Sequence, residues 1–179
     1  GTHTDITAHK AIQEEIFLAK EEYKQLVVSL RAIVWKFDLA LHKHTYISQE
    51  AEVILGYPLK DWFEIENFWR DRIYQEDKDW VLAFIAEQEQ MGLEYEFTYR
   101  MIHKDGSIIW LHDVVNTIYK DGKVIEFIGV MTDITKLKSS EDQLSQEKER
   151  LHVTLQSIVD GVITTDLLGN VDKVNASAL

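Results

Sequence analysis

The residues that could bind a metal or act as acids and bases are seven histidines and a few closely spaced carboxylates. His42 and His44 flank a predicted hairpin turn, but a zinc site needs about four ligands and the sequence suggests no others. Glu94 and Glu96 alternate along a predicted strand, a spacing typical of a solvated strand face. The chain has no cysteine, and no catalytic triad pattern, phosphate loop or HExxH motif is recognisable. We expect no metal site and no catalytic residue, with a small enzyme as a distant alternative.

A second group of candidate residues is aromatic and could enclose a small molecule. Two interpretations stay open, because large rings can fill a core or line a cavity. Arg100, His112 and Asn116 would be the polar contacts, and Arg100 would suit a ligand carboxylate. His112 shares its strand face with Trp110, so it either points inward toward a ligand or is an ordinary strand residue. The candidate lining residues are Phe37, Tyr46, Trp69, Tyr99, Trp110 and His112.

Five strands and several helices are predicted to position these residues. Residues 49–57 and 76–92 have helical composition, and Gly56 and Gly92 are placed to end them. On the second helix, Trp80, Phe84 and Ile85 are expected to form the apolar side. The predicted strands are residues 33–38, 44–48, 94–102, 108–119 and 124–134, with Asp-Gly turns between the last three. This order predicts an α+β fold: a five-stranded antiparallel sheet with helices on one face.

An internal repeat organises the rest of the chain. The pattern Gly-x-x-Thr-Asp-Ile-Thr occurs at residues 1–7 and again at 129–135, and each copy enters a segment without glycine or proline. Residues 29–38 also match residues 154–163. We therefore expect a segment of a tandem array. Its parts would be the last strand of an upstream repeat at 1–7, a linker helix at 8–28, a complete domain at 29–135, a second linker helix at 136–157 and the first hairpin of a downstream repeat at 158–179.

The second linker helix has a heptad pattern. Leu137, Leu144, Leu151 and Ile158 recur every seven residues, and Thr135 is placed to cap the helix. One interpretation is a single amphipathic helix that packs on its own domain. The other is a parallel coiled coil between two subunits, which predicts a homodimer.

Composition limits the partners. The net charge is −12, and an acidic body repels nucleic-acid phosphates, so no nucleic-acid binding is expected. No window of about eighteen apolar residues and no signal peptide is found, so this segment should make no membrane contact. The absence of cysteine is typical of a cytoplasmic protein.

The motifs together resemble those of the PAS family. The resemblance rests on Leu55-Gly56-Tyr57, residues 68–81, Tyr99-Arg100, Lys104-Asp105-Gly106 with Trp110, and the closing Asp133-Ile134-Thr135. It covers residues 29–135 in full. Tyr74-Gln75 departs from the subgroup, which usually has His-Pro at this step, so the loop before the long helix is expected to differ.

The resemblance implies a sensory module with a pocket between sheet and helices and a signalling helix after the sheet. It implies that Asp133, Ile134 and Thr135 couple the two. A flavin that forms a cysteine adduct and a thioester-linked chromophore are excluded by the absence of cysteine. Haem is disfavoured because residues 76–92 lack the family's helical histidine, which leaves a non-covalent flavin, a small metabolite or no cofactor.

The resemblance also suggests partners. Residues 151–170 resemble PAS domains that precede GGDEF or GGDEF–EAL modules, which implies cyclic-di-GMP signalling, or a kinase, as the downstream output. A ligand-free domain that serves only as a dimerising spacer is the alternative function.

Overall fold

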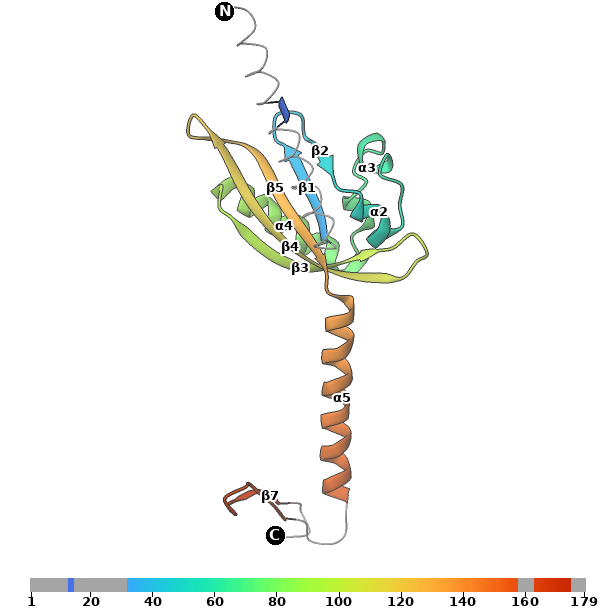
Figure 1. The fold of residues 1–179 in the computed structure, drawn as a ribbon, viewed down its shortest axis with the longest axis vertical. Helices are drawn as coiled ribbons and strands as arrows, with labels where there is room; N and C mark the ends of the chain where they lie inside the picture. Colours follow the sequence, from blue (N-terminus) through green and yellow to red (C-terminus); the bar gives the residue numbers. More distant parts are fainter. Residues whose placement is uncertain (1–12, 15–31, 158–162, 175–179) are drawn as a thin grey trace, which may run out of the picture. The chain divides into compact units, whose positions relative to one another are not determined.

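The computed structural model describes residues 13–14, 32–157 and 163–174 of the chain (Figure 1). The chain divides after Thr135 into two compact units. Among the described residues, no helix is both long and apolar enough to span a membrane.

The first unit is built on a five-stranded antiparallel sheet, as the sequence predicts, and its strand order is β2-β1-β5-β4-β3. Three α-helices and a 3-10 helix lie on one side of this sheet (Figure 1). The strands are β1 (Ala32–Asp38), β2 (Lys43–Ile47), β3 (Tyr95–Ile102), β4 (Ile108–Lys120) and β5 (Lys123–Asp133). The helices are α2 (Glu50–Leu55), α3 (Asp61–Glu64), η1 (Arg70–Arg72) and α4 (Gln75–Met91).

Alternating side chains and tight turns explain this sheet. On β3, Phe97, Tyr99 and Met101 are buried while their neighbours are more exposed, which is the period of two expected for a strand with one covered face. The turn between β4 and β5 has Asp121 and Gly122 at φ 51° and 75°. Positive φ at both central residues is the geometry that Asp-Gly favours in a two-residue hairpin.

The apolar side of helix α4 includes Phe84 and Ile85, as predicted, but not Trp80. Val81 is fully buried, and Leu82, Phe84 and Ile85 pack against the core. Trp80 is 43% exposed, because successive helical residues are turned by about 100° and the orientation that buries Val81 turns Trp80 outward.

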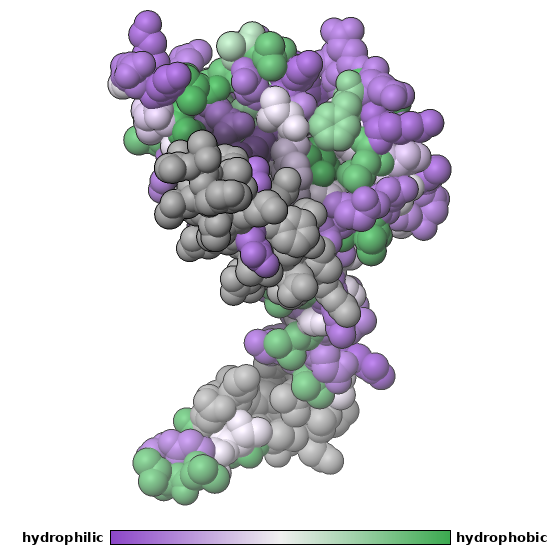
Figure 2. Space-filling model, turned by 45° about the horizontal axis from the view of Figure 1, so that its top comes forward, coloured by the Kyte–Doolittle hydropathy of each residue, from purple (hydrophilic) through white to green (hydrophobic). Residues whose placement is uncertain are grey.

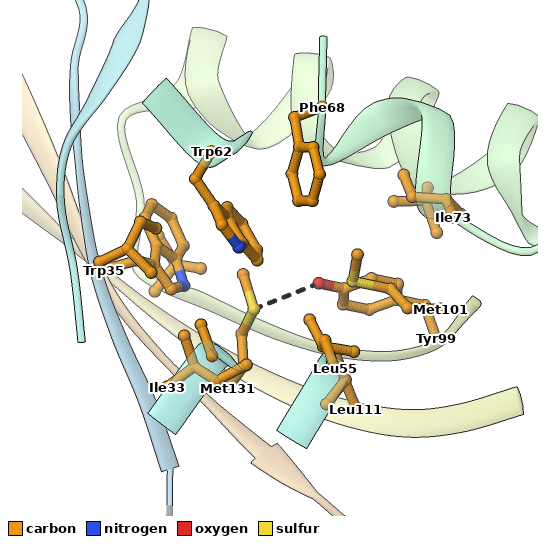
Figure 3. Packing of buried hydrophobic residues seen from close by; sticks show 14 of the residues in the cluster. Ile33, Trp35, Leu55, Trp62, Phe68, Ile73, Tyr99, Met101, Leu111 and Met131 are labelled. Carbon is orange, nitrogen blue, oxygen red and sulfur yellow. Dashed lines mark hydrogen bonds between the residues drawn. The ribbon is translucent and has the colours of Figure 1, made fainter. Parts of the chain in front are cut away.

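The core lies between the sheet and the helices (Figure 3). Trp62 and Phe68 descend from the helical layer with ring centroids 5.1 Å apart, and face Trp35 and Met131 of the sheet. Tyr99 stacks on Phe97 at 4.9 Å. The aromatic residues therefore do fill a core, although part of the space between them stays open, as described below.

The second unit contains a helix and a hairpin. Helix α5 (Thr135–Ser157) carries Leu137, Leu144 and Leu151, which are each more than half exposed. Strands β6 (Ile163–Thr165) and β7 (Val171–Val174) pair in an antiparallel hairpin. The predicted strand at 1–7, all but two residues of the first linker helix, and Ile158 lie outside the described residues, so the division into repeats stays a prediction.

Candidate functional site

A cavity of about 690 Å³ lies between the sheet and the helical layer, within the usual range for small-molecule sites. All five strands, α3, the segment from Ile65 to Arg70, and α4 contribute to its lining. The buried part of its wall is mainly aromatic. It includes Trp35, Trp62, Phe68, Phe97, Phe127 and a single carboxylate, Asp113.

Trp35 and Asp113 are joined across a strand by a hydrogen bond. Trp35 lies on β1 and Asp113 on β4, with β5 between them. Trp35 pairs in register with Gly129 of β5, and a Cβ at Gly129 would overlap the indole ring. Because Gly129 has no side chain, the indole crosses β5 and its Nε1 donates to Asp113 Oδ1 at 3.0 Å. Glycine inside a strand often marks such a close approach, which is the one sequence signal that could have revealed this pair.

Asp113 has a strongly perturbed acidity. It is 1% exposed, and burial raises the pKa of its carboxyl to about 7, although the hydrogen bond from Trp35 opposes this rise. In the part of the chain that the structure describes, no group donates a hydrogen bond to its second oxygen, Oδ2. Sequence reasoning missed Asp113, because a lone aspartate in a strand gives no motif.

His44 on β2 is a second perturbed group in the cavity wall. Its ring makes edge contacts with Trp35, Phe37 and Trp62 at centroid distances of 5.9, 5.3 and 5.7 Å. Burial among these rings lowers the pKa of His44 to about 4, so the imidazole is neutral at neutral pH. The sequence placed His44 at a turn, whereas the structure places it against the cavity.

Two features of the lining set its polarity. The Nε1–H of Trp62 is buried and finds no hydrogen-bond partner among the residues that the structure describes, and Trp62 itself is 4% exposed. The formally cationic lining residues, Lys43 and Arg70, are both exposed. The rim also carries exposed acidic residues, among them Glu64 and Glu89.

Of the six predicted lining residues, the structure places two in the wall and one behind it. Phe37 and Trp69 line the cavity. Tyr99 is fully buried, and its hydroxyl accepts a hydrogen bond from Trp69 Nε1 at 2.9 Å and points to Met131 Sδ at 3.6 Å. Tyr99 therefore supports Trp69 from the core.

Tyr46 lies away from the cavity because it pairs with Lys36, on the opposite face of the sheet from Trp35 and Ile47. Trp35 pairs with Ile47, but Phe37 pairs with His44, so one extra residue of β2 is accommodated between them. Such a bulge changes which residues share a face. Ile47 and His44 therefore face the core, and Tyr46 is 39% exposed.

Trp110 and His112 also lie away from the cavity, on the opposite face of β4. The buried residues of β4 are the odd-numbered Leu111, Asp113 and Val115, and alternation turns the even-numbered residues outward. His112 Nδ1 lies 3.2 Å from the Thr98 hydroxyl. It is not placed to bind a haem iron in the cavity.

Arg100 makes an ion pair within the fold. Its guanidinium donates to Asp77 Oδ1 at 2.6 Å and Oδ2 at 2.9 Å, and also to Glu76 at 3.0 Å. These hydrogen bonds hold the pKa of Asp77 below its usual value, since they favour the charged carboxylate. The expectation that Arg100 contacts a ligand carboxylate is therefore wrong: Arg100 joins β3 to the start of α4. The third polar candidate, Asn116, is exposed.

The Asp133-Ile134-Thr135 junction is tied to β4 by hydrogen bonds. Ile134 N–H donates to the Trp110 carbonyl at 2.9 Å, and Trp110 N–H donates to the Thr135 hydroxyl at 2.9 Å. Thr135 N–H in turn donates to Asp133 Oδ1 at 2.8 Å. The end of β5 and the first residue of α5 are thus fixed to one residue of the neighbouring strand.

Comparisons with known proteins agree with this architecture. A family model described as the PAS fold matches residues 44–131. The N-terminal domain of a diguanylate cyclase with a PAS/PAC sensor from Marinobacter aquaeolei is 37% identical. The match covers 57% of this chain and 94% of that one, with a TM-score of 0.54. A sensory box histidine kinase/response regulator from Burkholderia thailandensis E264 shares the fold with a TM-score of 0.58 at 22% identity, covering 73% of this chain and 97% of that one.

Two curated relatives are much longer than this chain. A probable diguanylate cyclase, DgcE, of Escherichia coli (strain K12) is 31% identical over 111 residues, which are 62% of this chain and 10% of that protein. Sporulation kinase C of Bacillus subtilis (strain 168) is 27% identical over 134 residues, which are 73% of this chain and 30% of that protein. The chain thus spans less than a third of either relative. Together with the sheet order, the helical layer and the Asp-Ile-Thr junction, the matches show that the chain belongs to the PAS fold family.

Proposed function

We propose that this chain is a sensory module that binds a small molecule in the cavity and relays its presence through the Asp133-Ile134-Thr135 junction into helix α5. The observation that carries the proposal is that β4 contacts both the junction and the cavity. Trp110 of this strand is bonded to Ile134 and Thr135, and three residues further on Asp113 lines the cavity. A single strand therefore links the cavity to the Asp133-Ile134-Thr135 junction.

A ligand could act through this strand by shifting it. A molecule that contacts Asp113 would favour the β4 position that suits it best, and the Trp110 hydrogen bonds would then change at the start of α5. A ligand that binds both positions equally would have no effect.

A filled cavity can be imitated by one substitution on α4. Ala86 lines the cavity, whereas Ala83 of the same helix does not, and both alanines are exposed. We expect Ala86→Trp to change amide hydrogen exchange of residues 134–140 by several-fold, and Ala83→Trp, the matched control, to leave it unchanged. Equal exchange in both variants would contradict coupling between cavity and junction.

The alternative function is a spacer without a ligand. Native mass spectrometry of freshly purified protein distinguishes the two, because a retained small molecule adds a discrete mass. An empty protein together with unchanged exchange in Ala86→Trp would favour the spacer.

We further propose that two copies pair through α5. The support is the exposed row of Leu137, Leu144 and Leu151 at heptad spacing, which has the pattern of a coiled-coil seam. Ile158, the next position of this row, lies outside the described residues.

In the whole protein, the module would control an output domain, either a diguanylate cyclase or a kinase. Both classes occur among the relatives, which supports this proposal. The segment itself would be cytoplasmic and non-catalytic, and cyclic-di-GMP signalling is the output that the more similar relatives suggest.

A non-covalent flavin does not match the cavity well. An isoalloxazine ring presents several acceptor atoms, and burying them without donors is costly. Among the buried lining residues that the structure describes, Trp62 Nε1–H is the unpartnered side-chain donor. The polar groups of the wall instead suit another kind of ligand.

A further inference from the structure

The polar atoms of the buried wall define what a ligand must offer. Within the described ranges of the chain, one oxygen of the Asp113 carboxylate accepts no hydrogen bond, and the Trp62 Nε1–H has no acceptor. Both side chains are more than nine-tenths buried, and both line the cavity. In Figure 3 the Trp62 indole projects from the helical layer toward Trp35 and Met131, so its polar edge faces the space that the sheet encloses.

We infer that the cavity binds a cationic amine: a ligand with an ammonium group that pairs with Asp113, an apolar or aromatic body, and one hydrogen-bond acceptor for Trp62 Nε1–H. This inference rests on the proposed sensory function, and it names the chemical class of the ligand.

The carboxylate of Asp113 favours a cation because no side chain in the described part of the chain neutralises its charge. Its one hydrogen bond comes from a neutral indole, and no described cationic side chain contacts it. A buried charge without a partner is costly, and a cationic ligand would remove that cost. The raised pKa of Asp113 reflects the same cost in the free protein.

The other titratable groups around the cavity do not replace such a cation. Burial keeps His44 neutral, and burial also raises the pKa values of Tyr95 and Glu89. Tyr99, behind the wall, likewise has its pKa raised by burial and is uncharged. The remaining ionisable lining residues are exposed: His42, Lys43, Glu64, Glu66 and Arg70.

The aromatic wall supports the same class of ligand. Ring faces attract cations, and most strongly where water is excluded. Trp35 and Trp62, the better rings for this purpose, are both in the wall. A carboxylate ligand, by contrast, would meet Asp113 without a buried cation to offset the repulsion, since Arg100 is bound to Asp77.

Three probes with one shared body separate these possibilities. Tyramine, tyrosol and 3-(4-hydroxyphenyl)propanoate all carry a 4-hydroxyphenyl group on a short chain that ends in an ammonium, a hydroxyl or a carboxylate. Binding is measured by isothermal titration at pH 8, where Asp113 is ionised. We expect tyramine to bind most tightly and the propanoate most weakly.

Two variants test the assignment of the carboxylate. Asp113→Asn keeps an oxygen for the Trp35 hydrogen bond but removes the charge. It should weaken tyramine binding by at least about 30-fold, the scale of a lost buried charge pair, and leave tyrosol within about 3-fold. Asp79→Asn, which removes one exposed charge from a residue that does not line the cavity, is the matched control and should leave tyramine within about 3-fold.

Three outcomes would overturn the inference. These are equal binding of tyramine and tyrosol, tightest binding of the propanoate, or no binding of any probe at millimolar concentration. The exchange experiment on Ala86→Trp uses no ligand. If it shows coupling while the probes fail, the sensory function stands and the amine class does not. If both fail, the sensory function fails as well.

Discussion

At the scale of single residues, two buried groups in one wall titrate in opposite directions. Asp113 has its pKa raised from 3.8 to about 7, so its proton stabilises the fold most below pH 3.8, and this contribution is lost as the pH rises through 7. His44 has its pKa lowered from 6.5 to about 4, so its contribution is present above pH 6.5 and is lost as the pH falls toward 4. Between pH 4 and 6.5 the two effects therefore oppose each other: as the pH rises, the contribution of Asp113 to the free energy of unfolding falls and that of His44 grows.

Removing the titratable carboxyl at position 113 should change how the free energy of unfolding depends on pH. We expect Asp113→Asn to gain stability relative to the native protein between pH 5 and pH 8, by about 2 kcal/mol, because the cost of ionising the buried carboxyl is removed. Urea unfolding at several pH values measures this. The exposed Asp79, changed to Asn, is the matched control. A constant difference between Asp113→Asn and the native protein across this range would contradict the buried, perturbed carboxyl.

At the scale of elements, three adjacent strands, β1, β5 and β4, are linked by one side-chain hydrogen bond that crosses the middle strand. Trp35 on β1 crosses Gly129 on β5 to reach Asp113 on β4. The cavity wall therefore depends on a strand position that has no side chain.

The crossing of Trp35 over Gly129 predicts that the effects of substitutions at these two positions on stability are not additive. Gly129→Ala should destabilise the fold by about 1–3 kcal/mol, because a methyl group would overlap the Trp35 ring. In a Trp35→Phe background the loss should be clearly smaller, since the smaller ring leaves room. A double-mutant cycle by thermal or urea unfolding gives the coupling, and equal losses in both backgrounds would exclude the overlap as the cause.

The sequence predicted the elements better than the site. The five strands of the first unit and the helices α4 and α5 were identified because alternation, Asp-Gly turns, glycine stops and heptad spacing are local signals. The direction of side chains depends on register, which local patterns do not determine. One bulge moved His44 to the cavity, and the parity of β4 turned His112 outward and Asp113 inward. The pairing of Arg100 with Asp77 joins residues that only the folded chain brings together.

At the scale of the whole molecule, the first unit buries apolar residues in a core of its own, whereas α5 carries an exposed row of leucines. Leu137, Leu144 and Leu151 are 55–57% exposed in the single chain. Exposed leucines at this spacing are typical of a helix that is completed by another copy.

Changing one leucine of the row should therefore alter the oligomeric state. We expect Leu144→Glu to shift the protein from dimer toward monomer in sedimentation equilibrium, with a dissociation constant at least about 10-fold higher, because like charges would meet at the seam. Gln146→Glu, on another face of the same helix, adds the same charge and should leave the constant unchanged. A monomer in all three proteins would refute pairing through α5.

The close approach of Trp35 to Gly129 also limits how this sequence can change over time. A larger residue at position 129 fits only after the indole at position 35 has been replaced, and that replacement removes the donor to Asp113. Among related chains we therefore expect these three positions to covary, so that a change at position 129 also reports a change in the cavity.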